Sequence, residues 1–158
     1  MAVDMFLKIG KLEGESLDDT HGGEIDLIAW NWGMSQSGSL HQGGSGGGKV
    51  SIDDISVTKY VDKASTDLML ACSSGEHYPE AKLTVRKAGK SPLEYIKVTM
   101  TDVLVKSVST GGSPGDDKLS EKVVLNFAKL KVEYTPQKKD GSADKTKEYT
   151  WDIQKNVK

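Results

Sequence analysis

Residues 24–49, with the sequence EIDLIAWNWGMSQSGSLHQGGSGGGK, constrain the fold more than any other stretch of the chain. Along residues 25–34, apolar side chains occur at both odd-numbered and even-numbered positions, and two of the three tryptophans lie two residues apart. This pattern predicts a strand that is covered on both faces and anchors the core. Residues 35–49 are instead rich in glycine and serine and contain no β-branched side chain, which predicts a long mobile loop. Compact domains rarely carry such loops without a binding or assembly reason, so this junction is the first place to look for function.

The composition is that of an ordinary globular protein. The chain has 158 residues, 36% hydrophobic and 28% charged, so we expect one core and a single domain spanning residues 1–158. A net charge of −2 provides no field that would attract nucleic acid or an anionic membrane, and we expect neither partner. Cys72 is the single cysteine, and the first residues lack a signal-peptide pattern. We therefore expect folding in the cytoplasm, which does not forbid export by a route that needs no signal peptide.

Most of the chain alternates with the period of β-strands. A bulge near Asp53 and Asp54 would explain a change of phase in one of these segments, and Val103 and Val105 break the phase of another. Strands are predicted over residues 3–9, 50–61, 81–86, 95–108, 122–134 and 149–157.

One segment has the pattern of a helix. Ser65 is its candidate N-cap, and Gly75 is a plausible residue just beyond its end, which predicts about ten helical residues. Residues 109–117 combine glycine, serine, proline and aspartate, and they predict an exposed loop. Seven or so strands with one short helix predict a mainly β fold, an antiparallel sandwich or barrel.

The run from Gly43 to Lys49 matches the spacing of a phosphate-binding loop, GxxxxGK. The context does not fit, because Val50 stands where Ser or Thr would hold magnesium. An alternating strand also follows where a helix should begin. A flexible, linker-like loop is the better interpretation, and no nucleotide cofactor is expected.

The histidines and the cysteine do not form a recognisable site. His21, His41 and His77 are far apart in turn or loop sequence, and one cysteine cannot complete a tetrahedral metal site, so no metal is expected. A nucleophile pair of Cys72 and His77 is conceivable. Cys72 lies on the apolar patch of the helix, however, which favours a small core residue.

Two pairs of adjacent carboxylates, Asp53–Asp54 and Asp116–Asp117, do not form an acid–base pair either. Neighbouring side chains in a strand or turn point apart and cannot share a substrate atom, so solvated turn charges are the better interpretation. With no catalytic arrangement in the sequence, no enzyme activity is expected.

Several long segments together resemble the haemolysin-coregulated protein (Hcp) family of type VI secretion systems. These segments are IDLIAWNWGMSQSGSLH with its glycine run, ISVTKYVDKAST, LMLACSSGEHYPEAKLTVRKAG, and VSTGG followed by LSEKVVLNFAKLKVEYTPQ. They occur in the family's order and span essentially the whole chain, which makes the resemblance far more specific than any short motif.

The resemblance implies an antiparallel β-barrel of two sheets with one short helix packed on its side. It further implies a homohexameric ring with a wide pore, and stacking of such rings into the inner tube of a contractile apparatus. The tube lies inside a contractile sheath and beneath a spike protein, is expelled when the sheath contracts, and carries small secreted effectors in the ring lumen. Because the chain ends at Lys158, directly after the last predicted strand, we expect a structural and carrier role without a toxin domain.

Two sets of residues are candidates for these roles. Asn31 lies between Trp30 and Trp32, so with both rings in the core, Asn31 and Ala29 would face outward toward the lumen and contact an effector. Alternatively, Asn31 forms a hydrogen bond within a subunit contact. The candidate ring-stacking loops comprise Gly43, Gly44, Ser45, Gly46, Gly47, Gly48, Lys49, Gly89 and Lys90.

A different class of function also fits the composition. The alternative is a monomeric β-sandwich binding module, for instance one that binds carbohydrate. The oligomeric state separates the two, because a monomer in solution would favour the module.

Overall fold

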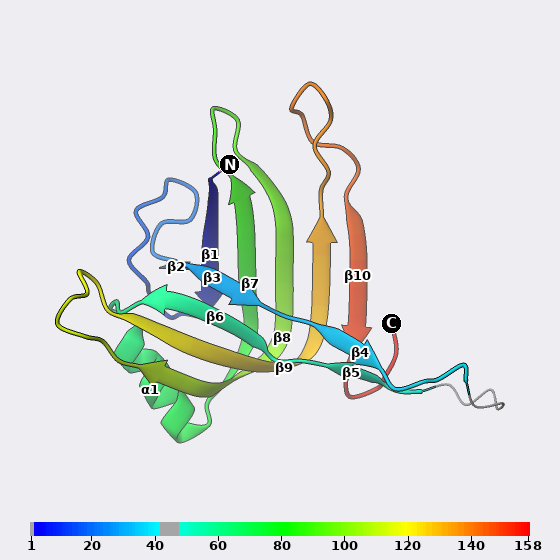
Figure 1. The fold of residues 1–158 in the computed structure, drawn as a ribbon, viewed down its shortest axis with the longest axis horizontal. Coiled ribbons are helices and arrows are strands. Elements are labelled where there is room, and N and C mark those ends of the chain that lie inside the picture. Colours follow the sequence, from blue (N-terminus) through cyan, green and yellow to red (C-terminus); the bar gives the residue numbers. More distant parts are fainter. Residues whose placement is uncertain (1, 42–47) are drawn as a thin grey trace.

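The computed structural model describes residues 2–41 and 48–158, and most of the described chain is β-strand (Figure 1). Helix α1 (Ser65–Ser74) packs against β8 on the outside of a strongly curled sheet. The mainly β fold with one short helix on its side is thereby confirmed. The strands are β1 (Val3–Ile9), β2 (Ile25–Asp26), β3 (Ala29–Asn31), β4 (Met34–Gln36), β5 (Val50–Ile52), β6 (Ile55–Tyr60), β7 (His77–Lys87), β8 (Leu93–Thr110), β9 (Ser120–Tyr134) and β10 (Lys147–Asp152).

Eight of these strands form one antiparallel sheet in the order β2-β1-β7-β8-β9-β6-β3, with β10 also paired to β9. The long strand β9 changes partner along its length. Its first half pairs with β6, from Ile55↔Leu125 to Tyr60↔Ser120, and its second half pairs with β10, from Lys147↔Tyr134 to Asp152↔Lys129. The remaining two strands, β4 and β5, form a separate two-stranded sheet. The predicted pairing of residues 95–108 with 122–134 is confirmed by the β8–β9 ladder.

Residues 25–31 close the curled sheet into a barrel. Their first part, β2, pairs with β1, and their last part, β3, pairs with β6, which lies at the other end of the strand order. Between the two strands, the Leu27 N–H donates to the Met5 carbonyl oxygen at 2.9 Å and the Ile28 N–H donates to the Thr58 carbonyl oxygen at 2.8 Å. The segment is therefore the seam of the barrel.

The prediction of one strand over residues 25–34, covered on both faces, is wrong. The segment forms three short strands with three different partners, because it crosses from β1 to β6 and then leaves the body as β4. Ala29 and Asn31 are exposed, and Trp30 and Trp32 are only partly buried against the core. In the described part of the chain no layer covers the outer side of β3, which explains the exposure.

Two changes of phase in the sequence have different structural causes. The predicted strand 50–61 is interrupted at Asp53 and Asp54, and its halves β5 and β6 belong to different sheets, so a break accounts for the slip in place of a bulge. In β8, Asp102 has a φ of +54°, which moves the buried side chains from the parity of Val98 and Met100 to that of Val103 and Val105.

Helix α1 matches its predicted length, with Gly75 in the left-handed conformation at a φ of +69° just beyond its end. Its N-cap residue, however, is Ala64, and the predicted cap Ser65 lies inside the helix. The Ser65 hydroxyl is buried and bonds to other groups, described below, so it is not available as a cap. The predicted strand 149–157 is also shorter in the structure, because β10 ends at Asp152 and a turn follows.

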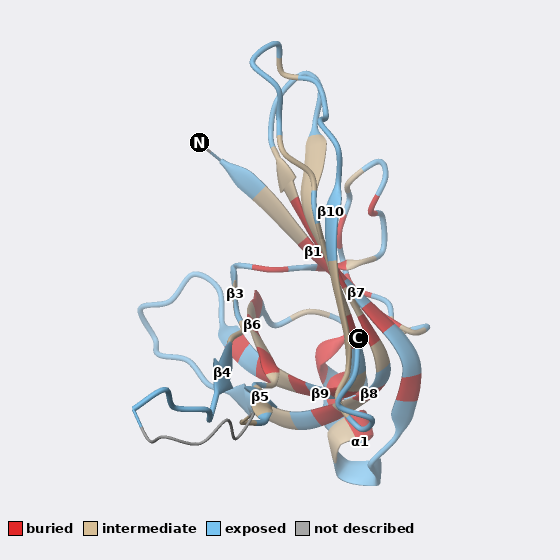
Figure 2. Ribbon diagram, turned by 90° about the vertical axis from the view of Figure 1, so that its right-hand side faces the viewer, coloured by how far each residue is buried: buried red, intermediate tan, exposed pale blue. Residues whose placement is uncertain are grey.

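The core lies inside the barrel and beneath α1. In Figure 2, buried segments alternate with exposed ones along the curled strands and continue into the helix. The largest fully buried apolar side chains of the core are Leu7, Ile9, Ile25, Ile55, Leu68, Leu83, Met100 and Leu125. Within residues 2–41 and 48–158, no helix is long and apolar enough to cross a bilayer.

Candidate functional site

The two predicted lumen residues lie on a surface of mostly small side chains, which we call the Asn31 face. In the strand register, Asn31 is opposite Ser56, Ser56 is opposite Val124, and Val124 is opposite Ser107. The neighbouring row runs from Ala29 through Thr58 and Lys122 to Ser109. The alternate positions, such as Val57 and Val123, are fully buried, so the two rows lie on the side of the sheet opposite the core. Lys122 is the one charged member of these eight residues.

The strands β4 and β5 form an arm that extends away from the body (Figure 1). We use the name arm for residues 34–41 and 48–52. Three ladder pairs hold it, from Met34↔Ile52 to Gln36↔Val50, and the Ser37 hydroxyl accepts the Lys49 N–H at 3.0 Å. Leu40 is fully exposed at 102% of its reference area, and Lys49 is also exposed.

The predicted ring-stacking residues are not brought together. Gly89 and Lys90 lie in the exposed turn between β7 and β8, at the top of Figure 1, whereas the arm extends from the lower right. Gly48 and Lys49 belong to the arm. Gly43, Gly44, Ser45, Gly46 and Gly47 lie outside the described residues.

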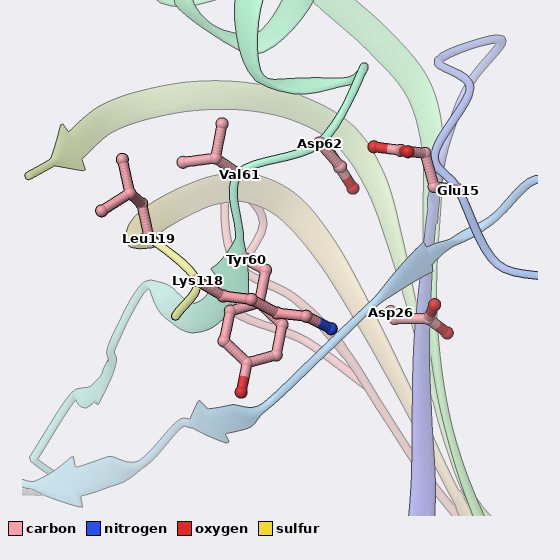
Figure 3. A pocket seen from close by; sticks show the side chains of 7 residues that line it. All are labelled: Glu15, Asp26, Tyr60, Val61, Asp62, Lys118 and Leu119. Carbon is pink, nitrogen blue, oxygen red and sulfur yellow. The ribbon is translucent and has the colours of Figure 1, made fainter. Parts of the chain in front are cut away.

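A cavity of about 410 Å³ opens near the end of β6 (Figure 3). We call it the Tyr60 cavity. Val61 and Leu119 form its apolar side, three carboxylates lie across from them, and the Lys118 Nζ lies 5.0 Å from the centre of the Tyr60 ring. Burial raises the pKa of the Asp26 carboxyl. The full lining is Glu15, Asp26, Tyr60, Val61, Asp62, Lys118 and Leu119.

A buried polar network lies behind this cavity. Lys59 and Glu121 are opposite each other in the β6–β9 register and form an ion pair in which both side chains are 0% exposed. The Lys59 Nζ also contacts the Asp62 Oδ1 at 2.9 Å and the Ser65 Oγ at 3.1 Å, and Ser65 donates to the Glu121 Oε1 at 2.5 Å. The network ties β6 and β9 to the start of α1.

His21, expected to be a turn residue, is buried. Its ring stacks on Phe6 with the centroids 4.4 Å apart, and its Nδ1 and Nε2 lie 2.5 Å from Glu24 and 2.6 Å from Glu94. Burial would raise the pKa of Glu94, but hydrogen bonds from His21 and Lys97 outweigh that effect and lower it. The contact fastens residues 21–24 to the start of β8.

Arg86 holds a second part of the loop between β1 and β2, which also contains His21. Its guanidinium donates to Asp18 at 2.5 Å and to Asp4 at 3.1 Å, and its Cζ lies 5.1 Å from the centre of the Phe6 ring. The hydrogen bond from Arg86 holds the pKa of the Asp18 carboxyl well below its usual value. Ion pairs as well as packing therefore hold the loop between β1 and β2 in place.

The remaining candidates from the sequence have structural roles. Cys72 packs against the core, and its thiol faces the Lys106 carbonyl oxygen at 3.7 Å, while His77 is exposed. Asp54 is not a solvated turn charge, because it accepts from Lys106 at 2.8 Å and from Asn126 at 2.7 Å. Among residues 2–41 and 48–158, no group of three or more His, Cys, Asp or Glu side chains is arranged to hold a metal ion.

The buried ion pair of Lys59 and Glu121 was not predicted, although the sequence contains a signal for it. Lys59 shares the parity of the apolar residues Ile55 and Val57, and Glu121 shares that of Val123 and Leu125, so a buried pair of opposite charges could have been predicted. The burial of His21 had no comparable signal, because its two carboxylate partners are 3 and 73 residues away.

Comparison with known proteins identifies similar chains along nearly the full length. Residues 6–134 match the family described as "Type VI secretion system effector, Hcp". The chain is 60% identical to Protein hcp1 of Pseudomonas aeruginosa over 160 residues, which cover 99% of each chain. Its fold is similar to the crystal structure of Hcp1 from Salmonella typhimurium, with a TM-score of 0.82, 40% identity and 99% of each chain covered. A structure described as a type six secretion system protein has a TM-score of 0.92, with 28% identity and 98% of each chain covered.

Proposed function

The chain belongs to the Hcp family of type VI secretion proteins, and on that premise we propose that it is a structural subunit of the type VI inner tube. In this role six copies form a ring, and rings stack into a tube beneath a spike protein and inside a contractile sheath. Contraction of the sheath expels the tube, so the protein assembles in the cytoplasm and is then secreted through the apparatus. The role requires no catalysis and no cofactor.

We also propose that the ring carries small effectors in its lumen and that the Asn31 face lines that lumen. The observation that carries this proposal is the two-row register around Asn31, which gathers three serines with one asparagine, threonine, alanine, valine and lysine. Small polar side chains can contact many folded surfaces without burying charge, which suits weak and reversible binding. A large apolar or highly charged lumen would hold one partner too tightly or repel others.

The substitution Asn31→Gln tests this role of the face. It adds one methylene at an exposed position, so the fold and the ring should stay intact while the lumen is crowded. We expect less effector recovered with secreted tube protein, and unchanged secretion of the tube itself. Asp144→Glu adds the same methylene on the exposed loop between β9 and β10 and should leave effector recovery unchanged. The lumen role is refuted if Asn31→Gln prevents ring formation or if effector export matches that of the wild type.

A further inference from the structure

The loop between β1 and β2 covers part of the sheet, and we use the name strap for its residues 10–24 (Figure 1). Phe6 precedes the buried core residue Leu7 along β1, so its ring lies on the side of the sheet opposite the core. The ring is nevertheless only 3% exposed, because His21 of the strap stacks on it. Its neighbour across the strands, Thr84, is 2% exposed. The strap therefore hides an apolar part of the outer surface.

The His21 ring has a carboxylate oxygen beside each of its nitrogens. Nδ1 lies 2.5 Å from the Glu24 Oε2, and Nε2 lies 2.6 Å from the Glu94 Oε1. A neutral imidazole carries one N–H and can donate to only one of these oxygens, so its other nitrogen would present a lone pair to an anion. His21 is 8% exposed, which leaves little access for a water molecule to bridge the second contact. Only the ring with both nitrogens protonated satisfies both carboxylates.

We propose that this arrangement makes the strap a pH-sensitive clamp. The strap is fastened to β8 while His21 carries two ring protons, and it loosens when one of them is lost to solvent. Gly22 and Gly23 line an open cavity of about 540 Å³ between the strap and the end of β1, so the strap has room to move. Loosening exposes the Phe6 ring. The inference does not depend on the proposed ring of six chains.

The charged groups around the stacked rings of Phe6 and His21 favour a cation at His21. Five are carboxylates and three are cations, and two of the cations, Arg86 and Lys97, are already paired with carboxylates of this set. The groups are Asp4 and Lys8 of β1, Asp18 and Glu24 of the strap, Asp26 of β2, Arg86 of β7, and Glu94 and Lys97 of β8.

The second anchor of the strap does not respond to pH in the neutral range. It consists of the contacts from Arg86 to Asp18 and Asp4. Arginine stays charged at every pH at which the protein is folded, and the hydrogen bond from Arg86 holds the pKa of Asp18 well below its usual value. A change between mildly acidic and mildly alkaline pH therefore acts on the His21 contacts and leaves the Arg86 contacts in place.

The sign of the effect follows from the open state. An open strap releases His21 to water, where a histidine loses its proton above about pH 6.5. The closed strap needs that proton for both carboxylates, so opening becomes more frequent as the pH rises past this value. We expect the open fraction to increase at least about tenfold between about pH 6 and about pH 8.5.

Hydrogen exchange of the full-length protein measures the open fraction. Within the strap, the Gly14, Ser16 and Gly23 N–H groups donate to the carbonyl oxygens of Gly23, Glu24 and Ser16 at 2.7, 3.0 and 2.9 Å. Deuterium uptake by peptides that cover residues 10–24 should be corrected for the pH dependence of chemical exchange itself. Residues 135–146 provide the internal reference, because this loop contains no histidine and its corrected uptake should not change.

Three variants separate a pH-sensitive contact from a merely structural one. His21→Gln removes the titrating ring, so the strap should be equally open at both pH values. Glu94→Gln offers an N–H to the unprotonated nitrogen of a neutral ring, so the strap should stay closed at the higher pH. His77→Gln is the matched control, since His77 is exposed on β7 outside the strap, and it should keep the wild-type increase. Melting temperatures verify the fold of each variant.

Equal corrected uptake by the wild-type strap at the two pH values overturns the clamp. An increase with pH that persists in His21→Gln overturns it as well, because another group is then responsible. If Glu94→Gln opens at the higher pH to the same extent as the wild type, the double contact with carboxylates is not the cause and the inference is also wrong.

Discussion

Replacing Lys59 by methionine should destabilise the fold more than any surface substitution. The ammonium group lies in a site with no solvent exposure, where it contacts Glu121, Asp62 and Ser65. Methionine fills a similar volume but leaves the Glu121 carboxylate without a cation. The Oε2 of Glu121 already lacks a hydrogen-bond partner in the described structure, so the remaining contacts cannot compensate for the loss.

Removing one partner of a buried ion pair costs about 3–5 kcal/mol, because the other charge remains buried and uncompensated. A domain of 150–250 residues loses about 2–4 °C of melting temperature per kcal/mol, so we expect Lys59→Met to lower it by roughly 6–20 °C. Lys106→Met is the matched control. It breaks an ion pair with Asp54 in which the lysine is 59% exposed, and such pairs contribute about 0–1 kcal/mol.

Thermal and urea unfolding at equal protomer concentration provide the assay, since the melting temperature of an oligomer depends on concentration. A double variant, Lys59→Met with Glu121→Leu, removes both charges and should recover most of the lost stability. The explanation is refuted if Lys59→Met costs less than Lys106→Met, or if the double variant is less stable than Lys59→Met alone.

Three further predictions use other parts of the structure. Because the pKa of Asp18 is lowered in the folded state, its stabilising contribution is complete above the unfolded value of about 3.9 and is lost as the pH falls below it. The melting temperatures of the wild type and Asp18→Asn should therefore differ by a constant amount above about pH 5 and converge in acid; a gap that widens in acid would contradict this sign. Deleting residues 43–48 changes the loop-closure entropy by well under about 1 kcal/mol, so stacking or secretion should decline with little change in melting temperature, and a decrease of many degrees would show that the loop is packed. Calorimetric titration should detect no micromolar binding of ATP with magnesium, because Val50 replaces the magnesium-binding hydroxyl residue and β5 stands where a helix should begin. Elemental analysis should find no zinc, because the three histidines are far apart in the sequence and a single cysteine cannot complete a tetrahedral site.

The parts of the fold that depend on local periodicity could be predicted from the sequence. Strand β1 matches its predicted bounds, α1 has the expected length, and the pairing of β8 with β9 was expected. The pairing of β1 with β7 and of β8 with β9 persists over many residues, so the alternation of side chains within these runs reports burial.

The barrel seam could not be predicted in the same way. Residues 25–31 change partner from β1 to β6 within a few residues, and alternation cannot reveal which strand lies on either side. The outward direction of Asn31 relative to Trp30 did follow from parity. The two rows of mostly small residues around it required the register of four strands, which only the structure provides.

The mass of the wild-type particle tests the central claim most directly. Native mass spectrometry combined with negative-stain imaging should find an annulus of six chains, with six times the 17.1 kDa mass of one chain. A monomer of 17.1 kDa at every concentration tested would contradict the ring and favour a monomeric β-sandwich binding module instead.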